Sequence, residues 1–281
     1  MKKTNLITVV LIFIGISTAF VFGRGAQGEG GKLKVATTTS LIEQIVERVG
    51  GTKVDVVNII PPAQCPGHFD VKPGDIQKLA DADVFFLHGW QGEMFSQQLI
   101  SSANNPDLNV VQLNIEGNWM VPSVQKEAAE KIVGVLIQVD SENGSYYQKL
   151  STTYKESIAL KETEIKAKLD KVDLSDTNVL CAEMLIGFVK WIGLNVVATY
   201  GRPDSLTPKV VKELVDKGRA RKVSLIIDNL QSGQDAGAGI AEELGCTRVI
   251  LSNFPGGVEH TETWEKAIEY NIRLISEAVA R

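Results

Sequence analysis

The chain has 281 residues, of which 44% are hydrophobic and 22% charged, and its formal net charge is −5. This length suits one or two globular domains, and the composition excludes a largely disordered chain. The acidic balance, with no basic cluster, argues against nucleic-acid binding, and three cysteines are too few for a disulfide scaffold.

The N-terminus predicts export. Lys2 and Lys3 precede an uncharged apolar run over 6–23, and small residues follow it. This order is typical of an export signal over 1–25 with a linker over 26–31. The alternative is an uncleaved anchor, because the run is near the minimum of about 17 residues for a membrane span. No Cys follows the run, which disfavours a lipoprotein signal. Either way, the body is expected in the periplasm or at the cell surface.

The first part of the body, residues 32–122, alternates predicted strands and helices. Strand patterns fall at 32–38, 53–60, 83–88 and 109–114, and helical patterns at 41–49, 76–82 and about 92–103. Asp75 is expected to cap the second of these helices. Such alternation predicts a mostly parallel sheet flanked by helices.

The middle part, residues 123–172, has helical patterns only. An amphipathic helix is predicted over 123–139 and a longer helix over 146–169, without internal Gly or Pro. At about 1.5 Å per residue the longer helix spans about 35 Å, which is enough to run along two small lobes.

The last part, residues 173–281, repeats the α/β alternation. Strands are predicted at 178–181, 195–199, 223–228 and 248–251, and helices at 184–192, 207–217, 236–244 and 263–279. The body is therefore predicted to be two α/β lobes joined by a long helix. Ligands of such sheets bind beyond the carboxyl ends of the strands.

Several short motifs follow one another in the order and spacing of a known family. They are VATTT at 35–39, PP at 61–62, HFD at 68–70, PGDI at 73–76, ADAD at 80–83, DSEN at 140–143 and Asn271. Over nearly the whole mature chain, this order resembles the zinc/manganese-type metal-binding solute-binding proteins of ABC transporters. The resemblance implies a rigid connecting helix, a metal in the cleft between two lobes, and a membrane permease as partner.

The sequence departs from that family at two of its usual metal ligands. Where the family has a His shortly before a Trp and a Pro, this chain has GNWMVP at 117–122. Near the end of the last strand the family has an Asp, and here Asn253 stands. The resemblance carries the first His ligand over to His68. At the third ligand position, Glu183 or Cys181 takes the place of the family's His or Glu.

Six residues are candidate metal ligands: His68, Cys65, Cys181, Glu183, Asp228 and His260. The spacing of Cys65 and His68 lets a thiolate and an imidazole reach one ion, although His68 could equally be an exposed loop residue. Cys181 ends a predicted strand, where it could meet Cys65 as a shared ligand, form a disulfide with it, or pack as a buried apolar group.

The remaining candidates also have two interpretations each. Asp228 ends a buried strand as either a cleft carboxylate or a helix cap, and Glu183 could bind metal or complement a helix dipole. His260 lies in a loop beside the last strand and could replace a missing ligand. Trp90 and Trp119 are expected to be cleft walls or core residues.

Imidazole, thiolate and carboxylate donors favour Zn²⁺ as cargo, with Mn, Fe, Co or Ni as alternatives. The two missing ligands leave open a chelated metal or a non-metal ligand.

A surface adhesin and a hydrolase using Cys181 with His68 or His260 are further alternatives. The sequence lacks the nucleophile-elbow, phosphate-loop and zinc-protease motifs. We therefore predict a monomeric, non-enzymatic solute-binding protein that delivers a divalent metal to an ABC permease.

Overall fold

The computed structural model describes residues 31–90, 93, 95–172 and 174–280. The predicted export signal over 1–25 lies outside the described residues. Residues 32–281 form one compact unit. Within the described ranges, no helix combines the length and apolarity needed to cross a bilayer.

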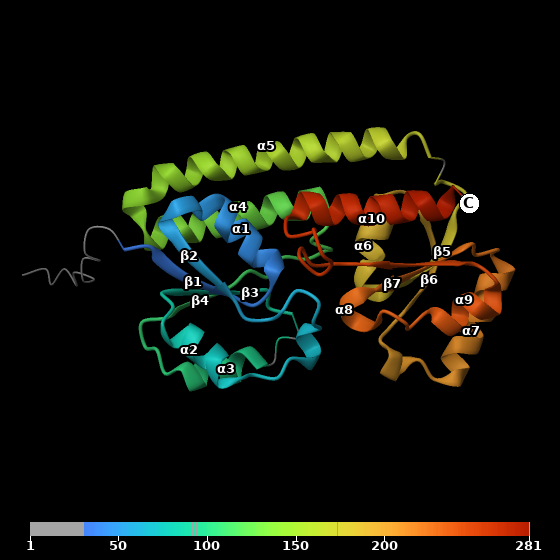
Figure 1. The fold of residues 1–281 in the computed structure, drawn as a ribbon, viewed down its shortest axis with the longest axis horizontal. Helices are drawn as coiled ribbons and strands as arrows, with labels where there is room; N and C mark the ends of the chain where they lie inside the picture. The colour runs from blue at the N-terminus through green and yellow to red at the C-terminus, as the bar shows by residue number, and fades with distance from the viewer. Residues whose placement is uncertain (1–30, 91–92, 94, 173, 281) are drawn as a thin grey trace, which may run out of the picture. The chain divides into compact units, whose positions relative to one another are not determined.

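The first lobe is built on a parallel sheet with the strand order β2-β1-β3-β4. Its strands are β1 (Leu33–Thr37), β2 (Val54–Asn58), β3 (Val84–Leu87) and β4 (Asn109–Gln112), and its helices are α1 (Ser40–Gly50), α2 (Pro73–Ala80), α3 (Phe95–Ala103) and α4 (Pro122–Val139). Helices α1 and α4 cover one face of the sheet, and α2 and α3 cover the other (Figure 1). Side chains of β3 alternate between these faces: Phe86 joins the core under α1 and α4, and Phe85 the smaller core with Leu79 and Leu99.

The second lobe repeats this plan with a parallel sheet of order β6-β5-β7-β8. Its strands are β5 (Asn178–Ala182), β6 (Asn195–Tyr200), β7 (Leu225–Asn229) and β8 (Thr247–Leu251), and its helices are α6 (Ile186–Trp191), α7 (Pro208–Ala220), α8 (Leu230–Gly233), α9 (Ala238–Leu244) and α10 (Trp264–Val279). Thr207 caps α7 by accepting a hydrogen bond from the Val210 amide, and Pro208 occupies the first helical position.

The prediction of two mostly parallel sheets flanked by helices is confirmed, with one local correction. Helix α2 begins at Pro73 and not at Ile76. Proline is favoured in the first turn because its fixed φ suits a helix and its missing N–H is not needed there. Asp75 therefore lies in the third helical position, where its carboxylate accepts a hydrogen bond of 3.0 Å from the Lys72 amide.

Helix α5 (Gly144–Leu169) is continuous over 26 residues and contacts elements of both lobes. Its buried side chains include Tyr154, Ile158 and Ile165, which join one core that extends through both sheets. Figure 1 shows α5 running above the first lobe and then alongside α10. Near its end, Lys168 forms an ion pair with Glu269 of α10 at 2.5 Å.

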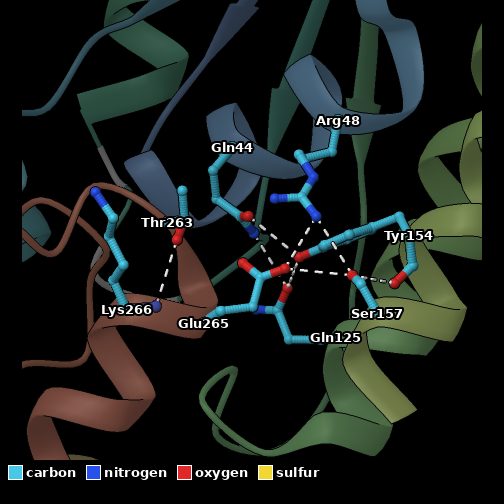
Figure 2. Close-up of polar contacts among 8 residues, drawn as sticks. All are labelled: Gln44, Arg48, Gln125, Tyr154, Ser157, Thr263, Glu265 and Lys266. Atoms are coloured by element: carbon cyan, nitrogen blue, oxygen red, sulfur yellow. Dashed lines mark hydrogen bonds and ion pairs between the residues drawn. The ribbon is translucent and has the colours of Figure 1, made fainter. Parts of the chain in front are cut away.

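A buried polar cluster, formed by Gln44, Gln125 and Tyr154, joins α1, α4 and α5 (Figure 2). The Tyr154 hydroxyl lies 3.1 Å from Gln44 Oε1 and 3.0 Å from Gln125 Oε1. Beside the cluster, Arg48 of α1 pairs with Glu265 of α10 at 2.9 Å. The second lobe is thus bonded directly to a helix of the first.

Replacing Tyr154 with Phe tests this cluster. The variant removes the hydroxyl that reaches Gln44 Oε1, while Gln125 Oε1 keeps a hydrogen bond of 3.1 Å from Gln44 Nε2. One buried amide oxygen is then left without its donor, so unfolding should become easier by about 1–3 kcal/mol. Urea denaturation measures the loss. Tyr146→Phe is the matched control on the same helix, because its hydroxyl bonds Thr52 in an exposed contact. The control should change stability by less than about 0.5 kcal/mol. Equal effects of the two variants would contradict the role given to the cluster.

Candidate functional site

A cavity of about 490 Å³ lies between the two lobes. It is lined by residues that follow every strand of the two sheets from β2 to β8, and by Leu41 of α1, which follows β1. These segments leave the carboxyl ends of the strands, where ligands of parallel sheets bind. The volume is within the range of about 300–1,000 Å³ that is usual for small-molecule sites.

The first lobe contributes the loop after β2. Cys65, Pro66 and Gly67 line the cavity, and Cys65 is 8% exposed. The short 3₁₀ turn Pro66–His68 brings the main chain to the cavity surface. The exposed side chain of His68 instead lines a neighbouring hollow of about 630 Å³.

Loops after β3 and β4 form an aromatic wall. Trp90 and Trp119 line the cavity, which confirms the expectation that they are cleft walls or core residues. His88 stacks on Trp90 with 3.6 Å between ring centroids and meets Trp119 edge-on at 4.4 Å. Burial lowers the pKa of His88 well below its usual range, and its Nε2 bonds Thr39 Oγ1 at 2.7 Å. His88 is therefore a neutral support for the wall.

Side-chain amides hold the two lobes together beside the cavity. Asn118 Nδ2 donates to the Met184 carbonyl and to Asn253 Oδ1, both at 2.8 Å. Asn253 Nδ2 also donates to the Met184 carbonyl at 3.0 Å, and Gln231 Nε2 to the Pro62 carbonyl at 3.0 Å. These amides are already hydrogen-bonded within the protein.

Arg202 follows β6 and reaches across the cavity. A Cβ atom placed on Gly67 of the first lobe would lie 2.7 Å from both Nη atoms of Arg202. The absence of a side chain at Gly67 therefore lets the guanidinium approach the opposite lobe. Among the described residues that line the cavity, Arg202 alone carries a charge.

Asp228 lies inside the second lobe and does not face the cavity. Its side chain is fully buried. One carboxylate oxygen accepts hydrogen bonds from the Tyr200 hydroxyl at 2.8 Å and the Gly237 amide at 2.7 Å. The other oxygen lies 2.7 Å from Nη1 of Arg248. Asp228 is thus a paired structural carboxylate here, and the expectation of a cleft group is not met.

Cys181, Glu183 and His260 are also away from the cavity lining. Cys181 is fully buried in the second-lobe core, and burial raises its pKa to about 12. All three cysteines are free thiols, so the Cys65–Cys181 disulfide is not formed. Glu183 is exposed next to Met184, and the His260 side chain is 86% exposed beside Glu259.

The structure therefore brings one of the six predicted ligands, Cys65, to the cavity, with His68 in the adjoining hollow. Within the part of the chain that the structure describes, no group of three or more His, Cys, Asp or Glu side chains could hold a metal ion. The expected imidazole, thiolate and carboxylate set does not assemble from these residues.

Sequence reasoning missed Arg202. The sequence did contain a signal for this residue, because Gly201-Arg202-Pro203 directly follows β6. The carboxyl end of β6 lies at the same edge of the sheet as the strand ends from which the other cavity loops leave. It also missed the pairing of Asn118 with Asn253, which are 135 positions apart. No local pattern links two such distant residues.

Residues 35–278 match the family described as zinc-uptake complex component A, periplasmic. Two similar curated proteins are lipoproteins of ABC transporters. The metal ABC transporter substrate-binding lipoprotein SsaB of Streptococcus sanguinis is 23% identical over 313 residues, covering 100% of each chain. The manganese ABC transporter substrate-binding lipoprotein PsaA of Streptococcus anginosus is 26% identical over 262 residues, covering 82% of each chain.

Solved structures share the fold. The solute-binding protein FpvC of Pseudomonas aeruginosa, in complex with Mn²⁺, superposes with a TM-score of 0.78 at 20% identity, covering 89% of this chain and 99% of that one. The crystal structure of ZnuA superposes with a TM-score of 0.76 at 16% identity, covering 88% and 99%. The two-lobed architecture is therefore that of solute-binding proteins.

Alkylation tests the placement of Cys181. Because burial raises its pKa to about 12, its thiolate is scarce and inaccessible near neutral pH. In the native protein at pH 8, we expect iodoacetamide to modify Cys181 roughly tenfold more slowly, or slower still, than the half-buried Cys246. In denaturing urea the two rates should converge. Peptide mass spectrometry measures both, and rapid native modification of Cys181 would contradict its place in the core.

Proposed function

This chain belongs to the family described as zinc-uptake complex component A, periplasmic, and we propose that it is the extracytoplasmic solute-binding component of an ABC transporter for a transition metal. The match covers nearly all of the described chain, and the curated relatives named above are metal ABC transporter components. The cavity between two lobes is the single observation that carries the proposal, because it has the size of a small-solute site and lies at the carboxyl ends of both sheets. The chain is a transport component and not an enzyme.

The partner that follows from this role is a membrane permease with its ATPase. Docking would use the exposed surfaces of both lobes, and the protein would act as a monomer outside the cytoplasm. We propose export through the N-terminal segment 1–25, with either cleavage or retention as an anchor. The curated relatives are lipoproteins, which supports an extracytoplasmic place for this chain.

The cargo is a metal held either as an ion or within a chelate. Relatives that bind manganese, and a family described by zinc uptake, support the metal. We propose Cys65 as the thiol donor, since it lines the cavity, and His68, which lines the neighbouring hollow, as a further donor. Glu183 is exposed next to the lining residue Met184 and would reach the ion only by local movement. Cys181, Asp228 and His260 would need to move to take part, as each lies elsewhere.

A chelated metal or a non-metal ligand is the second candidate. One specific observation favours it: the described residues of the cavity lining offer amides, aromatic rings and an Arg, but only one thiol and no carboxylate or imidazole. Transition metals in proteins usually have several such donors at about 2.0–2.3 Å. A chelator would supply the donors that the lining lacks.

Elemental mass spectrometry with calorimetry tests the metal cargo. The reduced protein is titrated with Zn²⁺, Mn²⁺, Fe²⁺, Co²⁺ and Ni²⁺, each alone and with an organic chelator. We expect one metal per chain in at least one form. Cys65→Ser should weaken its binding roughly tenfold or more, because a donor is lost. His260→Ala is the control, since that exposed side chain lies outside the cavity. Absence of any metal in either form would refute the proposed cargo.

Small-angle scattering tests how the cavity opens. Helix α5 contacts both lobes without a break, and amide bonds join the lobes beside the cavity. We therefore expect the radius of gyration to be the same with and without cargo, within error. Cargo would enter by local movement of loops such as 61–68. A large compaction on binding would contradict this and indicate a wide hinge.

A further inference from the structure

The charge of the cavity does not suit a bare cation. Arg202 is the single charged side chain among its described lining residues, and it is positive. An Arg guanidinium stays protonated at all physiological pH values. A metal ion entering this cavity would meet a fixed positive charge and no opposing carboxylate. Like charges repel more strongly in a cavity with little water than in bulk solvent.

The guanidinium of Arg202 has no partner of its own. Within the described chain, no hydrogen bond or ion pair is made by its side chain. Two acidic residues are close in the fold, Glu183 near Gly201 and Asp204 two positions further along, yet neither is within ion-pair distance of Arg202. A half-buried cation with five N–H donors and no acceptor is suited to bind an anion from outside.

The amide side chains of the cavity are less available to a ligand than Arg202. Those of Asn118, Asn253 and Gln231 already form hydrogen bonds within the protein, as described above. The indole Nε1 of Trp119 is buried and, like Arg202, has no hydrogen-bond partner among the described residues. The remaining lining is largely apolar, including Leu41, Trp90 and Phe254. The cavity thus offers one fixed positive charge against an aromatic and aliphatic wall.

We propose that the cavity binds a small organic molecule through a carboxylate group held by Arg202, with the body of the molecule against Trp90 and Trp119. A carboxylate matches the planar fork of a guanidinium with two parallel hydrogen bonds. The volume of about 490 Å³ accommodates such a molecule. The carboxylate belongs either to a free organic acid or to a chelator that carries the metal. The second form rests on the proposed function, and Arg202 then binds the chelator while the chelator binds the metal.

Gly67 is part of this arrangement. Because it has no Cβ, the Arg202 side chain can extend over the loop of the first lobe. The ligand would therefore be held by a residue of the second lobe at a point that touches the first. Gly67→Ala would place a methyl group 2.7 Å from both guanidinium nitrogens and displace them without changing the charge.

Calorimetry on the full chain tests the proposal with defined probes. The probes are citrate and pyridine-2,6-dicarboxylate, their Ni²⁺ complexes, and Ni²⁺ alone. Arg202→Gln removes the charge, and Arg221→Gln is the matched control, because Arg221 is exposed at the end of α7 and does not line the cavity. We expect at least one carboxylate probe to bind, and Arg202→Gln to weaken it roughly tenfold to hundredfold. Arg221→Gln should leave the affinity within about twofold, since a distant exposed charge is largely screened.

Comparing the probes with and without Ni²⁺ identifies the source of the carboxylate. Binding of a probe without Ni²⁺ indicates a free organic acid, and binding only of its Ni²⁺ complex indicates a chelate. Both outcomes support the proposal. It is overturned if Ni²⁺ alone binds while Arg202→Gln leaves its affinity unchanged or raises it. It is also overturned if no carboxylate probe binds the native protein more tightly than the Arg202→Gln variant.

Thermal unfolding and a second variant separate the possible failures. Thermal unfolding of Arg202→Gln should match the native protein, because this side chain has no partner to lose within the described residues; Gly67→Ala gives a second variant that retains Arg202. Failure of the proposed function would appear as Arg202-dependent binding of a free acid with no metal retained in any form. Failure of the present inference would appear as a bare metal ion retained through Cys65.

Discussion

The mounting of both lobes on α5 is the constraint on which the rest of the structure depends. A continuous helix of 26 residues packs on α1 and α4 of the first lobe and on α10 of the second. Tyr154 buries its hydroxyl between two glutamine amides of the first lobe, and the Arg48–Glu265 pair joins α1 to α10. A buried polar contact resists separation because an unpaired group would cost its full desolvation energy. The lobes are thereby held at one spacing.

This spacing decides what the cavity can be. The carboxyl ends of the strands of both sheets open onto one gap, so loops distant in the sequence become neighbours there. Asn118, Asn253 and Gln231 then bond across the gap and close part of it. Their amides are used in joining the lobes. What remains for a solute is an aromatic wall, the thiol of Cys65 and the charge of Arg202.

The family supplies the architecture, and the side chains at the cavity supply its chemistry. Residues 35–278 match a family described by zinc uptake, and the fold matches the structures of FpvC with Mn²⁺ and of ZnuA at 16–20% identity. Similar folds carry different ligands when loop residues change, because the loops build the site. In this chain the described lining residues include one positive side chain, Arg202, and no carboxylate. This lining is the basis of the proposal that the cavity accepts a chelated metal or an organic acid.

The sequence by itself determined the alternation of strands and helices, the two parallel sheets and the long helix. These depend on local periodicity and on residues a few positions apart, so one sequence suffices to predict them. It also predicted Trp90 and Trp119 to be cleft walls or core residues. Six ligands were predicted from the family resemblance and from positions at strand ends and in loops, and one, Cys65, reached the cavity lining.

Only the tertiary structure decided the rest. Asp228 ends a strand, as predicted, but Arg248 from the neighbouring strand neutralises it inside the lobe. Cys181 occupies a strand end whose side chain points into the core. Arg202 gains its place because Gly67, far away in the sequence, leaves room for it. The direction of a side chain at a strand end, and the partner that it meets, depend on packing between distant segments, which no local pattern in one sequence records.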